Sequence, residues 1–158
     1  MILAAVAALA LVVAASATGL PQGGSGEVGG SEHLVKMLVY ASVALLFSFL
    51  CSVAEAVMLS ISPSFVAHLE QQGKPVAKRI KKLKGNIDQS LAAILTLNTI
   101  AHTLGAGGAG AEAAAYFGDK YVGVSMAVLT LLILFLSEIV PKTIGALYWR
   151  QLAGATAA

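Results

Sequence analysis

The sequence predicts an all-α membrane protein with three core transmembrane helices, short cytoplasmic helices beside the membrane, and a signal peptide or extra helix at the N-terminus. Hydrophobic residues make up 58% of the 158 residues, charged residues only 11%, and the mean hydropathy is +0.83. Soluble domains carry about 25% charged residues. Inside a bilayer every backbone polar group must be satisfied by the protein itself, and a helix does this locally. A soluble fold is therefore excluded.

The first 20 residues form an Ala-rich apolar run that supports two interpretations. A secretory signal peptide fits the short run and the small residues at 15–17, although the usual basic start is missing. An uncleaved helix also fits, because about 19 apolar residues just suffice to span a bilayer. Residues 21–33 are rich in glycine and polar side chains and predict a flexible external linker. Residues 34–158 then form the transmembrane domain.

Three long segments of this domain are expected to cross the membrane. The first covers residues 34–60, the second begins at residues 88–104, and the third covers residues 121–149. The second continues through a run of small residues, GAGGAGAEAAAYFG, which lets helices approach closely or bend. Tyr148 and Trp149 fit the aromatic belt at a membrane interface.

The loop at residues 65–85 holds six of the ten basic residues, namely Lys74, Lys78, Arg79, Lys81, Lys82 and Lys84. By the positive-inside rule this loop is cytoplasmic, in a multi-pass protein of the plasma or inner membrane. Its mixed pattern predicts short helices on the membrane surface, with lysines near anionic headgroups. Binding of nucleic acid is not expected, because no supporting fold motif is present. Cys51 is the single cysteine, so no disulfide can form within the chain.

Glu138 lies inside an apolar run, LTLLILFLSEIVPKTIGALYWR. An ionisable residue within a membrane helix usually faces a partner, an ion or a water-filled cavity. Pro141 has no N–H, so it frees backbone carbonyl groups one turn earlier, chiefly that of Ser137. A carboxylate beside freed carbonyl groups can bind a cation. The alternative is a charge that is paired inside the helix bundle beside an ordinary proline kink.

Polar side chains in the other two spans lie at a matching depth. Ser48 and Ser52 are four residues apart and Glu55 follows three residues later, so they share one helix face. Counted from the cytoplasmic ends of their helices, Ser52, Asn98 and Glu138 lie roughly 12 to 18 Å deep at 1.5 Å per residue. We therefore expect these side chains to meet between the helices.

Hydroxyls, an amide oxygen, a carboxylate and a freed carbonyl suit hard cations such as Mg²⁺ or Na⁺, and not zinc or copper. Taken singly, each polar residue also has a structural explanation. The serines can bond to their own helix, and Asn98 can bond to a neighbouring helix. His102, four residues after Asn98, is interpreted as a packing or hydrogen-bonding histidine and not as a ligand.

Three segments resemble the transmembrane domain, CNNM or DUF21, of the CNNM/CorB/CorC magnesium transporters: SFLCSVAEA, the LNT around Asn98, and SEIVPKT. The resemblance covers about residue 34 to the C-terminus, and it implies a homodimer of three-span subunits that bind Mg²⁺. The implied metal ligands are Ser48, Ser52, Asn98, Ser137 through its carbonyl, and Glu138, with Glu55, Pro141 and Lys142 as supporting residues.

The sequence departs from the family pattern at Val53 and Ser137, where the family usually has glycine. The paired CBS nucleotide-binding modules that usually follow the domain are not found in these 158 residues, and the chain stops at QLAGATAA. Such an ending is expected of a truncated protein, a partial gene product or a minimal family member.

We expect a transporter that moves Mg²⁺ across the bilayer, and the resemblance suggests Na⁺ as the exchanged ion. The alternative is a non-transporting membrane anchor or ion sensor for cytoplasmic regulatory modules. An enzyme is not expected, because the sequence contains no HExxH, nucleophile-elbow or phosphate-loop motif.

Overall fold

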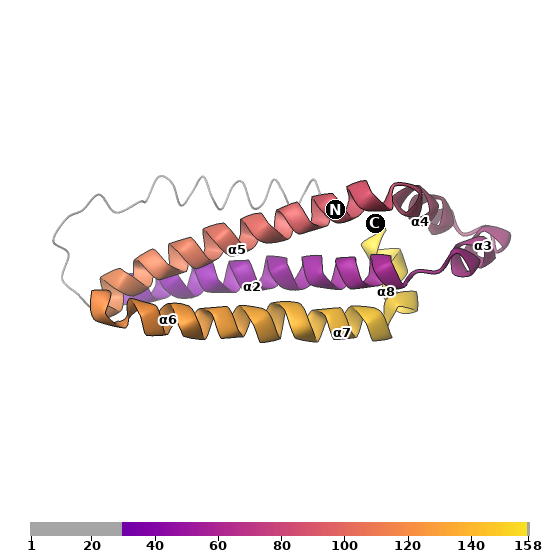
Figure 1. The fold of residues 1–158 in the computed structure, drawn as a ribbon. Helices are drawn as coiled ribbons and strands as arrows, with labels where there is room; N and C mark the ends of the chain where they lie inside the picture. The colour runs from indigo at the N-terminus through magenta and orange to yellow at the C-terminus, as the bar shows by residue number, and fades with distance from the viewer. Residues whose placement is uncertain (1–29, 158) are drawn as a thin grey trace.

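The computed structural model describes residues 30–157, and within this range it contains helices and no strands. Three long segments lie side by side (Figure 1). They are α2 (Ser31–Ser60), α5 (Ile87–Phe117), and a composite of α6 (Asp119–Leu132), the π-helix η1 (Ile133–Ile139) and α7 (Val140–Leu147). α2 contacts α5, η1 and α7, and α5 also contacts α6, so each long segment packs against the other two. The predicted all-α fold is confirmed.

Three short helices gather at one end of the bundle: α3 (Pro63–Gln71), α4 (Pro75–Gly85) and α8 (Trp149–Thr156). Ser62 caps α3 by accepting a hydrogen bond from the N–H of Phe65, and proline is the first residue of both α3 and α4. A buried apolar cluster joins these helices to the end of α2, and it consists of Val57, Ile61, Val66, Leu69, Ala77, Ile80 and Ala153.

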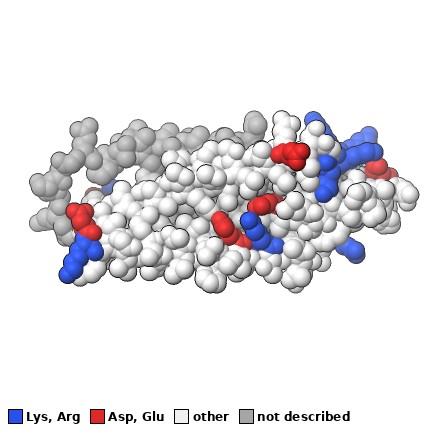
Figure 2. All heavy atoms as spheres, in the orientation of Figure 1, with Lys and Arg blue, Asp and Glu red and all other residues white. Residues whose placement is uncertain are grey.

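The basic residues of the chain are concentrated at this same end. Figure 2 shows lysine and arginine side chains gathered over α3 and α4, beside a long, mostly uncharged body. Lys84 also donates a hydrogen bond of 3.1 Å to the carbonyl oxygen of Met58, which ties the end of α4 to α2. The short helices predicted for residues 65–85 are therefore present, and their lysines and arginine form one charged end.

The small-residue run of α5 is used for close approach and not for a bend. α5 continues as one helix to Phe117, and Gly105 and Gly108 face Ala44 and Tyr40 of α2. The chain reverses at Gly118, whose φ of 78° lies in the region that favours glycine. The third segment can therefore return along α2.

Within residues 30–157, two helices are long and apolar enough to cross a membrane, Ser31–Ser60 and Asp119–Leu147. Most of the large apolar side chains that are exposed on the surface lie on the three long segments. Examples are Leu46, Val128 and Phe135. A bilayer would cover such a surface. α5 has 31 residues but is more polar and glycine-rich than the other two, so its membrane crossing stays a prediction.

The helix ends differ slightly from those predicted. α2 begins at Ser31, so the last residues of the expected linker are helical. The third segment ends at Leu147, and Trp149 begins α8 instead of closing the span. Residues 1–29, which contain the predicted signal peptide or extra helix and most of the linker, lie outside the described residues.

Candidate metal site between three helices

Ser48, near the middle of α2, contacts both other long segments. Its Oγ lies 3.4 Å from the carbonyl oxygen of Ser137 in η1 and 2.5 Å from Nε2 of His102 in α5. The Ser48 side chain is completely buried. The structure therefore brings together Ser48 and Ser137, two of the ligands that the family resemblance implied, and adds His102 to them.

Two further predicted ligands, Ser52 and Asn98, have buried oxygen atoms without a hydrogen-bond partner. These atoms are the Oγ of Ser52, on a residue with no exposed surface, and the Oδ1 of Asn98. Cys51 of α2 and Leu97 of α5, which directly precede them in the sequence, belong to one buried cluster. A buried polar atom without a partner costs about 1–3 kcal/mol. Such atoms point to a ligand or to an ordered water molecule.

The backbone before Pro141 forms a π-helical turn. The N–H of Val140 bonds to the carbonyl of Phe135, five residues earlier, and the turn covers Ile133–Ile139. Pro141 cannot donate to the carbonyl of Ser137, which instead accepts the Ser48 hydroxyl. The Ser137 hydroxyl is used within its own helix, 2.7 Å from the carbonyl oxygen of Ile133. π-helical turns occur frequently at functional sites.

Glu138 lies within this π-helical segment, directly after Ser137, and is half-buried. Its Oε1 lies 3.9 Å from Nδ1 of His102, and 33% of its side chain is exposed within the chain. The carboxylate therefore lies across from α5, on the same side of the bundle as the contact between Ser48 and His102. A carboxylate with partial access can exchange a cation with its surroundings.

The supporting residues Glu55 and Lys142 form an ion pair between α2 and α7. Their Oε2 and Nζ atoms are 3.3 Å apart, and the Glu55 side chain is the more buried of the two. Glu55 lies three residues after Ser52, and Lys142 lies four residues after Glu138. The pair is therefore about one helical turn from the candidate ligands, and it neutralises the second carboxylate near them.

Of the residues near the candidate ligands, His102 was not predicted to be part of the site. The interpretation of His102 as a hydrogen-bonding histidine agrees with its contact to Ser48. Its spacing of four residues from Asn98 was the only sequence signal that could have placed it beside the ligands. The structure shows that it reaches residues of both other segments.

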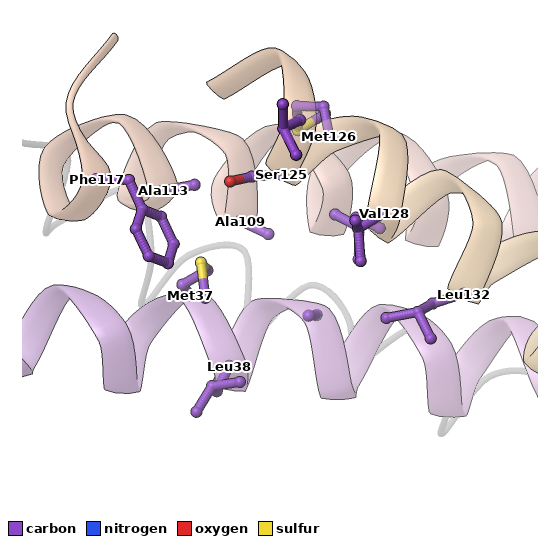
Figure 3. A pocket seen from close by; sticks show the side chains of 12 residues that line it. Met37, Leu38, Ala109, Ala113, Phe117, Ser125, Met126, Val128 and Leu132 are labelled. Carbon is purple, nitrogen blue, oxygen red and sulfur yellow. The ribbon is translucent and has the colours of Figure 1, made fainter. Parts of the chain in front are cut away.

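A separate pocket of about 300 Å³ lies between α2, α5 and α6, towards the α5–α6 turn (Figure 3). Its lining includes Met37, Leu38, Phe117, Met126 and Leu132 and is almost entirely apolar. Apolar side chains offer no ligands to a hard cation.

Residues 30–157 also contain no cluster of three or more His, Cys, Asp and Glu side chains, so hydroxyl, amide and carbonyl oxygens must contribute to any metal site.

Comparison with known proteins agrees with this fold. Residues 39–158 match the model of the cyclin M transmembrane N-terminal domain, CNNM. The chain is 32% identical over 120 residues to the UPF0053 protein sll1254 of Synechocystis, and the aligned region covers 76% of this chain and 35% of that protein. It is 30% identical over 100 residues to the UPF0053 inner membrane protein YfjD of Escherichia coli, which covers 63% of this chain and 23% of YfjD. The chain thus spans about a quarter to a third of the length of these relatives. It belongs to the CNNM family of membrane proteins.

Proposed function

We propose that this domain binds Mg²⁺ between its three long helical segments and transports it across the membrane. The ligands are the hydroxyls of Ser48 and Ser52, the amide oxygen of Asn98, the carbonyl of Ser137 and the carboxylate of Glu138. Mg²⁺ prefers oxygen ligands and usually binds one or two carboxylates while it keeps several water molecules. This ligand set meets that preference.

The observation that carries the proposal is the pair of unpartnered oxygen atoms on Ser52 and Asn98. Buried polar groups are nearly always hydrogen-bonded, so these two atoms require a ligand or a water molecule as a partner. Ser52 and Asn98 lie four residues, or about one helical turn, from Ser48 and His102 respectively, which contact each other. A cation with its remaining water molecules would satisfy all of these oxygen atoms together.

The charges near the site leave one carboxylate, Glu138, available to a cation. Glu138 has no lysine or arginine within ion-pair distance among the described residues, whereas Glu55 is paired with Lys142. The site therefore contributes one negative charge, and the bound cation keeps a net positive charge. A site with modest charge and flexible water ligands favours release as well as binding, which transport requires.

The test is a flux assay with the complete chain in liposomes that contain a fluorescent Mg²⁺ indicator. We expect a Mg²⁺ gradient to produce flux in the parent protein and a strongly reduced flux in Asn98→Ala. Thr99→Ala is the matched control, because Thr99 is the next residue on α5, is exposed, and bonds only to its own helix. A parent that binds Mg²⁺ but produces no flux would contradict transport and favour an ion sensor.

Coupling to Na⁺ is part of the same proposal and is tested in the same vesicles. An opposing Na⁺ gradient should accelerate Mg²⁺ flux if the two ions exchange, whereas a K⁺ gradient of equal size should not. Equal rates under both gradients would remove Na⁺ from the proposal and leave Mg²⁺ transport standing.

A further inference from the structure

His102 lies on the same side of the bundle as the proposed Mg²⁺ ligands, although it supplies a nitrogen atom and not an oxygen. Its two ring nitrogens lie near two different ligands: Nε2 is 2.5 Å from the Ser48 Oγ, and Nδ1 is 3.9 Å from the Glu138 Oε1. Only 22% of the side chain is exposed. The ring therefore lies between α2 and η1, with one edge towards each.

The two contacts of Ser48 are consistent with one arrangement, in which His102 donates to Ser48. The carbonyl oxygen of Ser137 can only accept, so the Ser48 hydroxyl donates its proton there. The Ser48 Oγ then accepts from His102, which requires the proton of a neutral imidazole to be on Nε2. Nδ1 is consequently left with a lone pair. We assign this tautomer from the hydrogen-bond network.

The Nδ1 lone pair and the Glu138 carboxylate are then two electron-rich groups with a gap between them. At 3.9 Å their separation is too long for a hydrogen bond. Two adjacent ligand atoms that bind one metal ion at about 2.1 Å each lie roughly 3.0 Å apart in octahedral and roughly 3.4 Å apart in tetrahedral geometry. At 3.9 Å the two atoms are slightly farther apart than this, so a small side-chain movement would let one divalent cation contact both.

We propose that Nδ1 of His102 is a direct ligand of the transported cation and extends the cargo from Mg²⁺ to transition metals such as Mn²⁺ and Zn²⁺. This inference rests on the proposed function, since it assigns one more ligand to the same site. Mg²⁺ gains little from an imidazole nitrogen because it prefers oxygen, whereas zinc and other first-row metals bind imidazole well. His102 is thus the specificity-determining residue of the site.

The decisive variant is His102→Gln. A glutamine side chain places an N–H group close to the position of Nε2, so it keeps the hydrogen bond to Ser48. It has no atom in place of Nδ1 that could bind a metal ion. If His102 is a ligand, this variant should lose about tenfold or more in Zn²⁺ affinity, as changes to metal-supporting partners typically do. Its Mg²⁺ affinity should change less than about threefold. His68→Gln is the control, because His68 is exposed on α3 and contacts Gln72.

A second measurement does not depend on any variant. Mn²⁺ bound to the parent protein should show electron spin echo modulation from a directly bound nitrogen, and His102→Gln should lack it. Mg²⁺ should compete for this Mn²⁺. If Mn²⁺ binds in competition with Mg²⁺ without nitrogen modulation, and the ratio of Zn²⁺ to Mg²⁺ affinity is the same in parent and His102→Gln, His102 is only a positioning residue and the inference is wrong.

Failure of the proposed function gives a different result. In that case neither Mg²⁺ nor Mn²⁺ binds, or both bind equally well to Glu138→Gln. Loss of Mg²⁺ and Zn²⁺ affinity to the same extent in His102→Gln would also contradict the specificity role, because it would show that the residue supports the site without distinguishing between metals.

Discussion

Gly105 of α5 packs directly against Ala44 of α2. A Cβ atom on Gly105 would overlap the Cβ of Ala44, and it would lie 3.2 Å from the Ala44 Cα and 3.3 Å from the carbonyl oxygen of Tyr40. Both residues are almost completely buried. This contact lies close to Ser48 and His102 along the two helices, so it sets how near α5 approaches α2 at the candidate site.

We expect Gly105→Ala to destabilise the protein by about 1–3 kcal/mol, because inserting a methyl group into a closely packed contact forces the backbone to move. Gly107→Ala is the control. It lies on the same helix, and a Cβ there would meet nothing within 4 Å, so the better helix propensity of alanine should leave stability unchanged or slightly raised. Thermal melting in detergent compares them. Equal melting temperatures for the two variants would contradict the close contact.

Ser52→Ala should stabilise the metal-free protein slightly, because it removes a buried hydroxyl that has no partner. In Mg²⁺ the same variant should be less stable than the parent, because one ligand is missing. Ser60→Ala serves as the control, since the Ser60 hydroxyl bonds to the carbonyl of Ala56 and lies outside the site. A Ser52→Ala protein that is destabilised equally with and without Mg²⁺ would show that the hydroxyl is structural.

Much of this architecture could be predicted from the sequence because it depends on local patterns. Apolar length gives the long helices, and Pro63 with Ser62 marks the start of α3. Helical rise converts residue counts into depth, and this placed Ser52, Asn98 and Glu138 at one level of the membrane. The family resemblance added Ser48 and the carbonyl of Ser137, which the structure brings into contact. Depth alone does not fix rotation about the helix axis. The approach of His102 to Ser48 depends on that rotation, which close packing at Gly105 sets, so it could not be read from spacing.

The π-helical turn was also beyond sequence reasoning. Pro141 indicates that the carbonyl of Ser137 is free, but a simple kink and a widened turn both leave it free. The structure selects the widened turn at Ile133–Ile139, which places Glu138 opposite His102. The pairing of Lys142 with Glu55 also depends on how α7 is rotated against α2, so it could not be read from the sequence.

The Glu55–Lys142 pair should show a positive coupling energy. Glu55→Gln and Lys142→Met each leave one charge without its partner, so each single variant should be less stable than the parent. The double variant has neither charge, so its loss of stability should be smaller than the sum of the losses in the two single variants. Polar contacts between membrane helices contribute on the order of 1 kcal/mol, and a double-mutant cycle of melting experiments can resolve this value. Strictly additive effects would show that the pair does not contribute.

The basic end formed by α3 and α4 should face the cytoplasm. Cysteine introduced at Lys78, which is exposed on α4, should react with a membrane-impermeant maleimide only after the cells are opened. Cysteine introduced at Lys120, exposed at the opposite end of the bundle, should react in intact cells. The buried native Cys51 should contribute little background. The reverse labelling pattern would invert the orientation of every segment.

Glu138→Gln should remove most of the stabilisation that Mg²⁺ gives to the protein. Among the proposed ligands only Glu138 carries a charge, and a charged oxygen should contribute more to Mg²⁺ affinity than the neutral oxygens of Ser48, Ser52 and Asn98. A ligand at 100 times its Kd stabilises the folded state by about 2.7 kcal/mol. The parent should therefore melt at a clearly higher temperature in Mg²⁺, and Glu138→Gln should not.

The metal-free proteins supply the control for this measurement. Glutamine keeps the size of the side chain and removes a charge that is costly within a membrane, so without Mg²⁺ the variant should be as stable as the parent or more stable. The melting temperatures of parent and variant, each with and without Mg²⁺, thus distinguish weaker Mg²⁺ binding from a damaged fold. Only in Mg²⁺ should the parent melt at a higher temperature than the variant. A Mg²⁺-induced shift of equal size in both proteins would exclude Glu138 as a ligand, and the unpartnered oxygens of Ser52 and Asn98 would then need another explanation.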